Sequence, residues 1–132
     1  MPFGRIADPV GKPTERCLAV LHRAIASGTG RGLDFFSSFM RGVWAEGIDA
    51  GSEAGLCRIA ARAGLDAAFV KAALADESWR TVAEANRAEM LASGLWGVPT
   101  FRVDDGSARW GQDRLWQIER DLVAATHAIK AQ

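Results

Sequence analysis

The sequence contains few of the residues that build metal and redox sites. Among its 132 residues are two histidines and two cysteines, and neither cysteine belongs to a C-x-x-C pair. Neither His22 nor His127 has a cysteine or carboxylate at the spacing of a second metal ligand. We therefore expect no metal site. We expect Cys17 and Cys57 to be free thiols that act as small buried hydrophobic residues in a reducing compartment.

Charge of one sign and long apolar runs are also missing. Sixteen basic residues balance sixteen acidic ones, so no overall field attracts nucleic acid or an anionic membrane surface. No apolar run approaches the roughly 18 residues of a membrane span. The first residues, Met1–Arg5, lack the apolar core of a signal peptide. These absences predict a cytoplasmic protein without nucleic-acid or membrane partners.

What the sequence does have is a run of amphipathic helical patterns. Thr14 is a suitable N-cap for a first helix that ends at Ala26. A second helix is predicted from Leu33 to Glu46, with Gly47 as its stop. The apolar positions that share a face in these two helices are Cys17, Leu18, Leu21 and Ile25, and then Leu33, Phe36, Phe39, Met40, Val43 and Trp44. The second helix is the predicted centre of the core.

Three further helices follow. Ser52 and Asp66 can cap two short ones, which end near Gly64 and Leu74. A longer helix runs to about Ser93, and its apolar face holds Trp79, Val82, Asn86 and Met90. Asn86 is polar on this face. It is therefore either a buried amide bonded to the backbone or a contact for a substrate.

The pattern changes after Gly94. Thr100–Val103 is predicted as a strand, Asp104–Ser107 as a turn and Ala108–Trp110 as the returning strand of a hairpin. Gln112 or Asp113 then opens a closing helix. We predict an α+β, mostly helical single domain over 1–132, with helices over 14–93 and the hairpin plus closing helix over 94–132. A two-stranded sheet is marginal alone, so the sheet is expected to be incomplete.

The Val98–Pro99 bond lies just before the predicted hairpin. A residue that precedes proline is restricted to extended conformations. If the bond is also cis, the chain turns sharply and leaves the N–H and C=O groups of Val98 unpaired. Such a backbone edge can pair with an extended peptide.

Two segments carry a family resemblance. Gly94–Phe101 reads Gly-Leu-Trp-Gly-Val-Pro-Thr-Phe, and Trp110–Leu115 reads Trp-Gly-Gln-Asp-Arg-Leu. Together they closely resemble the C-terminal end of the 2-hydroxychromene-2-carboxylate isomerases. These enzymes and the kappa-class glutathione transferases belong to the DsbA-like branch of the thioredoxin fold. Trp44–Asp49 and Ala63–Asp66 resemble landmarks of that family's helical insertion.

The resemblance implies a fold and a ligand. The chain would be the C-terminal part of a DsbA-like thioredoxin fold: helical insertion, β-hairpin and closing helix. Pro99 would be cis, and the backbone of Val98 would hold the cysteinyl part of glutathione. Gln112 and Asp113 would receive its γ-glutamyl end, with Asp113 on the ammonium group. The second substrate would be a small aromatic or electrophilic molecule. From the residues alone, Asp113 could instead cap the helix.

The sequence also departs from the family. The family has an N-terminal strand–helix–strand unit with a serine that activates the glutathione thiol. This unit has no counterpart here, so the catalytic residues are unknown. We expect the chain alone to be inactive, and a homodimer or a partner chain to complete the sheet. One alternative is a non-catalytic module that dimerises or docks on a thioredoxin-fold partner. A DsbA-like thiol oxidoreductase follows only from the fold name and lacks C-x-x-C. Trp44, Trp96 and Trp110 either line a substrate pocket or lie in the core, and we expect the core positions.

Overall fold

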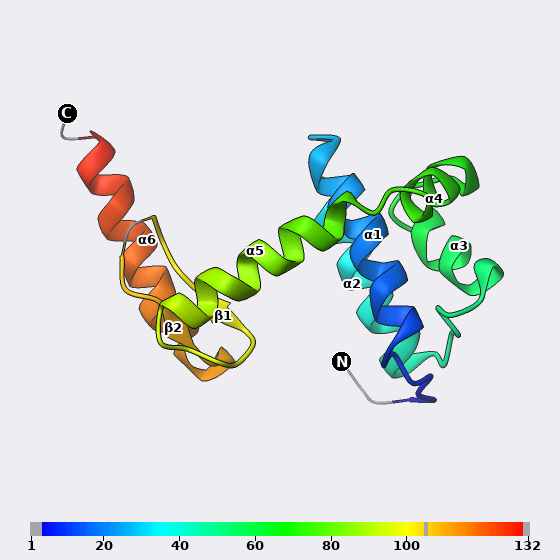
Figure 1. The fold of residues 1–132 in the computed structure, drawn as a ribbon, viewed down its shortest axis with the longest axis horizontal. Helices are drawn as coiled ribbons and strands as arrows, with labels where there is room; N and C mark the ends of the chain where they lie inside the picture. The colour runs from blue at the N-terminus through cyan, green and yellow to red at the C-terminus, as the bar shows by residue number, and fades with distance from the viewer. Residues whose placement is uncertain (1–3, 105, 131–132) are drawn as a thin grey trace. The chain divides into compact units, whose positions relative to one another are not determined.

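The computed structural model describes residues 4–104 and 106–130, and only the backbone beyond residue 127. In these residues the chain forms six α-helices, one β-hairpin and one short 3-10 helix (Figure 1). The elements are α1 (Lys12–Ala26), α2 (Arg31–Ala45), α3 (Glu53–Ala61), α4 (Ala67–Leu74), α5 (Ser78–Ala92), β1 (Thr100–Phe101), β2 (Arg109–Trp110), η1 (Gln112–Arg114) and α6 (Leu115–Lys130). The predicted order of helices, hairpin and closing helix is confirmed.

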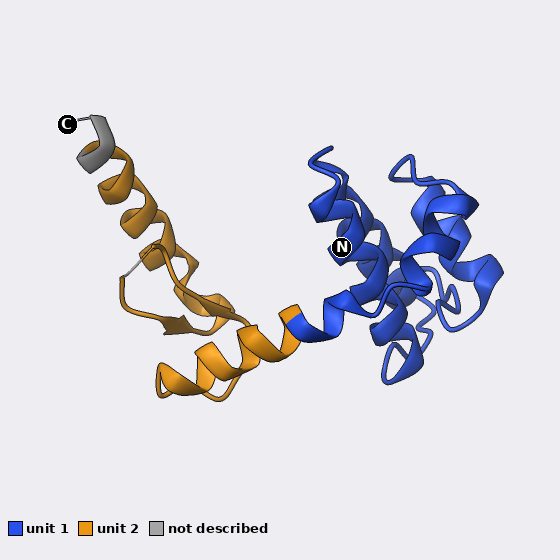
Figure 2. Ribbon diagram, turned by 45° about the horizontal axis from the view of Figure 1, so that its top comes forward, with its two compact units in different colours: residues 1–81 blue, residues 82–132 orange. Residues whose placement is uncertain are grey.

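The chain divides into two compact units, 1–81 and 82–132, and the division falls inside α5 (Figure 2). The single domain that the sequence predicts therefore stays a prediction.

Within the described residues, no helix combines the length and the hydrophobicity that crossing a membrane requires.

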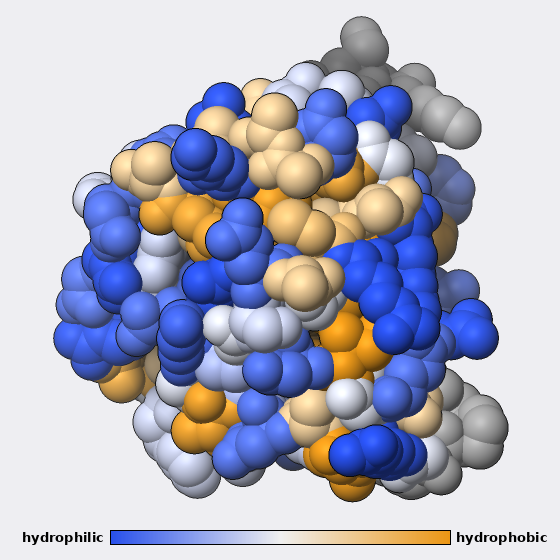
Figure 3. All heavy atoms as spheres, turned by 90° about the vertical axis from the view of Figure 1, so that its right-hand side faces the viewer, coloured by the Kyte–Doolittle hydropathy of each residue, from blue (hydrophilic) through white to orange (hydrophobic). Residues whose placement is uncertain are grey.

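The first unit holds the hydrophobic core. Helix α2 packs against α1 and α3, and α4 packs against α1 and α3. The largest fully buried side chains are Val20, Phe35, Val43, Leu56, Ile59 and Val70. The side of this unit that carries α3 and α4 is mostly hydrophilic, with hydrophobic residues in small separate patches (Figure 3).

Helix ends follow local chemistry. The Ser52 hydroxyl accepts a hydrogen bond from the N–H of Gly55, and the Asp66 carboxylate accepts one from Phe69, as the two predicted caps require. Gly47 has a φ of 65°, which only glycine adopts at low cost after a helix. The cap predicted at Thr14 is wrong. The N-cap is Gly11, three residues earlier, and α1 begins at Lys12, because Pro13 is well suited to a first helical turn.

The predicted faces of the first two helices are partly wrong. Ile25 in α1 and Leu33 in α2 are exposed, and Phe35 is fully buried where the sequence predicted Phe36. The reason is close approach at small residues. Gly32 lies against Ile25, and Gly42 lies against Ile59, so the buried face of α2 includes these two glycines beside Phe35 and Phe39.

The second unit contains the hairpin and has no hydrophobic core among its described residues. Strands β1 and β2 pair antiparallel, with Thr100 opposite Trp110 and Phe101 opposite Arg109. The ladder is shorter than predicted: β1 ends at Phe101, and the next residue, Arg102, forms an ion pair with Glu89 on α5. Asp105, in the predicted turn, lies outside the described residues. No residue in the described part of 82–127 is buried.

Candidate functional site

The loop before β1 has the predicted cis bond. The Val98–Pro99 peptide bond is cis, and the Val98 side chain is 83 % exposed. Among the described residues, the backbone N–H and C=O of Val98 form no hydrogen bond. The loop is folded back by Thr100, whose hydroxyl donates to the carbonyl oxygen of Gly97. Val98 therefore offers a free donor and a free acceptor at the surface.

One hydrogen bond joins this loop to the start of the closing helix. The backbone N–H of Gly111 donates to the carbonyl oxygen of Pro99 at 3.0 Å. Gln112 and Asp113 follow Gly111 directly, in η1, which leads into α6. The structure therefore brings the two halves of the predicted site into one place, although they are separated in the sequence.

Asp113 does not cap the helix. The N-cap residue of η1 is Gly111, and Asp113 is the second residue inside this short helix. Its carboxylate is 77 % exposed and lies 4.0 Å from the Arg114 guanidinium. A Cβ atom at residue 111 would overlap this carboxylate, so glycine leaves it room. The alternative in which Asp113 only caps the helix is wrong, and its carboxylate is free to meet a cation.

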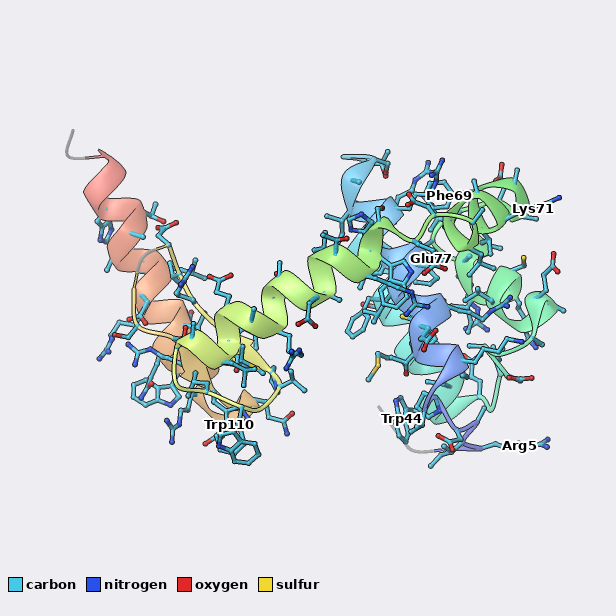
Figure 4. All side chains as sticks on the ribbon, viewed as in Figure 1. Arg5, Trp44, Phe69, Lys71, Glu77 and Trp110 are labelled. Atoms are coloured by element: carbon cyan, nitrogen blue, oxygen red, sulfur yellow. The ribbon has the colours of Figure 1, made fainter. Side chains whose placement is uncertain are left out.

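Two tryptophans lie beside the loop. The rings of Trp96 and Trp110 are 5.0 Å apart and tilted by 43°. Trp110, labelled in Figure 4, packs against the backbone of Gly97. Trp96 is 75 % exposed. The core positions predicted for these two residues are therefore wrong, since the unit has no core to receive them. Trp44 does pack on the core of the first unit.

A groove of about 490 Å³ opens between α5 and β1. The polar and large residues that line it from α5 are Asn86, Arg87, Glu89 and Met90, and Ser93 follows just after the end of this helix. Those from the hairpin side are Val98, Thr100, Arg102 and Asp104. We call this the α5–β1 groove. Asn86 is exposed here, so its interpretation as a buried amide is wrong, and its contact with a substrate stays a prediction.

Sequence reasoning missed Arg102 as a functional candidate. Val98, Thr100, Arg102 and Asp104 alternate along the chain, and alternate residues of an extended segment share a face. That period of two was visible in the sequence. The ion pair between Arg102 and Glu89, which spans the groove, was not.

The remaining candidates for redox or metal chemistry are weak. Both cysteines are free; Cys17 is buried in α1, and burial raises the pKa of its thiol to about 12. In the part of the chain that the structure describes, no group of three or more His, Cys, Asp or Glu side chains is placed to hold a metal ion.

The comparison with protein families gives one result. The model of the DSBA-like thioredoxin domain matches residues 3–123, so the chain belongs to this family. The match covers nearly the whole chain and does not confirm the predicted lack of an N-terminal strand–helix–strand unit. No curated protein matches the chain.

Proposed function

We propose that this chain carries a binding site for glutathione of the kind found in 2-hydroxychromene-2-carboxylate isomerases and kappa-class glutathione transferases. Membership of the DsbA-like thioredoxin family supports a thiol-related function. The observation that carries the proposal further is the hydrogen bond from Gly111 to Pro99, which sets Gln112 and Asp113 beside the free backbone of Val98.

The chemistry of glutathione suits these groups. Its cysteinyl residue is an extended peptide unit with one N–H and one C=O, which can pair with those of Val98. Its γ-glutamyl end is a zwitterion. The ammonium group of this end would meet the carboxylate of Asp113, which does not cap the helix. The α-carboxylate of glutathione would meet Gln112 and the first N–H groups of the η1–α6 segment.

The second substrate of this proposal is a small aromatic or electrophilic molecule. The exposed ring of Trp96, tilted against the Trp110 ring, offers a planar apolar surface two residues before Val98. No residue of this chain matches the serine that activates the thiol in the related enzymes. We therefore expect the chain alone to bind glutathione weakly and to show no isomerase activity.

Calorimetry tests this proposal. Glutathione is titrated into the wild type, into Asp113→Asn, and into Glu119→Gln as a matched control on α6, the helix that follows η1. We expect about a tenfold loss of affinity for Asp113→Asn, since one charge-assisted hydrogen bond is lost, and no loss for Glu119→Gln. Equal affinities in all three proteins would remove Asp113 from the site.

A second candidate function is a non-catalytic module that pairs with a second copy or with a thioredoxin-fold partner. The observation that favours it is the two-stranded sheet, in which β1 pairs only with β2 among the described residues. Leu115, Trp116, Leu122 and Val123 of α6 are about half exposed. Light scattering at several protein concentrations decides this point, because a monomer throughout would argue against self-association.

A further inference from the structure

The α5–β1 groove begins at the proposed glutathione site. Of the four residues proposed to bind glutathione, only Val98 lines it. The carbonyl oxygen of Pro99 is bonded to Gly111, beside Gln112 and Asp113, neither of which lines the groove. A peptide held at Val98 with its γ-glutamyl end at Asp113 would therefore direct its other end into the groove.

Two arginines line the groove, and they differ in where their acidic partners lie. Arg87 donates two hydrogen bonds, of 2.9 and 2.8 Å, to the carboxylate of Glu84 on its own helix. Arg102 forms an ion pair with Glu89 on the other wall of the groove, its one acidic partner among the described residues. The side chains of this pair are 41 % and 51 % exposed. Because water screens exposed ion pairs, exchanging Glu89 for another carboxylate costs little.

The spacing along the chain fits glutathione. Val98 and Arg102 are four residues apart, at most about 13 Å in an extended chain. From the cysteinyl to the glycyl residue of glutathione, an extended peptide spans about 7 Å. The arginine side chain covers the remaining ~6 Å, so its guanidinium can meet the glycyl carboxylate.

We propose that Arg102 receives the C-terminal carboxylate of the thiol peptide held at Val98, and that this carboxylate replaces Glu89. A guanidinium binds a carboxylate through two parallel hydrogen bonds, which gives the site a preference for peptides with a free C-terminus. Arg102 is then a specificity-determining residue for short thiol peptides. This inference rests on the proposed function, because it needs glutathione at Val98.

The test compares glutathione with its glycyl ethyl ester, in which that carboxylate is blocked. Affinities are measured by NMR titration of the full chain. We expect the wild type to bind the ester about tenfold more weakly than glutathione. In Arg102→Gln the two ligands bind alike, at the affinity of the ester. Glu89→Gln tightens the binding of glutathione and leaves the ester unchanged.

Arg87→Gln is the matched control, because Arg87 lines the same groove but is hydrogen-bonded to Glu84. The ratio of the affinities for glutathione and its ester should be that of the wild type in this variant. Equal binding of both ligands to the wild type overturns this inference alone. A ratio that survives in Arg102→Gln also overturns it. If neither ligand binds the wild type, the proposed function fails and the inference fails with it.

Discussion

The guanidinium of Arg109 on β2 holds the carboxylate of Asp121 on α6, with Nε and Oδ2 2.8 Å apart. This half-buried ion pair ties the closing helix to the hairpin in a unit that has no buried residue among those described. It therefore helps to keep the start of that helix beside Pro99. The Arg109 guanidinium holds the pKa of Asp121 below its usual range.

Asp121→Asn is expected to destabilise the second unit in a pH-dependent way. Since the pKa of Asp121 is lower in the folded chain than in the unfolded one, its stabilising effect is present at neutral pH. It is lost as the pH falls through the folded pKa, below about 4. In urea unfolding we expect the variant to be less stable than the wild type at neutral pH, and the difference in unfolding free energy to be smaller at an acidic pH below the ordinary pKa range of an aspartate. Glu119→Gln serves as control, and a deficit that is the same at both pH values would contradict the assignment.

Gly97→Ala is expected to displace Trp110. A Cβ atom at residue 97 would overlap the Trp110 indole, so the ring must leave its place beside Trp96. We expect the unfolding free energy to fall by about 1 to 3 kcal/mol and the near-ultraviolet circular dichroism spectrum to change. Gly97→Ala combined with Trp110→Ala should cost less than the sum of the two single changes, because the overlap is gone. Simple additivity would show that the two residues are not in contact.

Phe35→Ala and Phe36→Ala separate the observed core face of α2 from the predicted one. Phe35 is fully buried and Phe36 is 41 % exposed. We expect Phe35→Ala to cost about 3 to 5 kcal/mol of unfolding free energy in the first unit, and Phe36→Ala clearly less. Equal losses would restore the face that the sequence predicted. Urea unfolding followed by circular dichroism gives both values.

The two cysteines should differ in reactivity. Cys17 is buried, and its pKa of about 12 keeps it a thiol at neutral pH, whereas Cys57 is partly exposed. We expect iodoacetamide to modify Cys57 first, and Cys17 only after unfolding, as mass spectrometry of the peptides can show. Rapid modification of Cys17 in the folded chain would contradict this expectation and would support a redox role for its thiol.

Features set by neighbouring residues were predictable from the sequence. The caps at Ser52 and Asp66 and the stop at Gly47 depend on one turn of chain, and all three are confirmed. The buried faces of α1 and α2 depend on where glycine lets the helices approach. The prediction assigned these faces from the positions of bulky apolar residues alone, and was therefore partly wrong.

The candidate site was predictable only in part. The cis bond at Pro99 followed from the family resemblance, since its spacing alone does not require one. The hydrogen bond from Gly111 to Pro99, the uncapped Asp113 and the ion pair of Arg102 with Glu89 each join residues across a turn or a loop. No local pattern specifies such contacts, so they came only with the structure.

We propose above that the Val98–Pro99 loop and the Gln112–Asp113 helix start form one binding site for glutathione. A two-dimensional ¹⁵N NMR titration of the wild type with glutathione tests whether both segments respond to the same ligand. We predict that the amide signals of Gly97 and Val98 shift together with those of Gln112 and Asp113, with a single dissociation constant. Shifts in only one of the two segments, or no shifts in either, would contradict the claim.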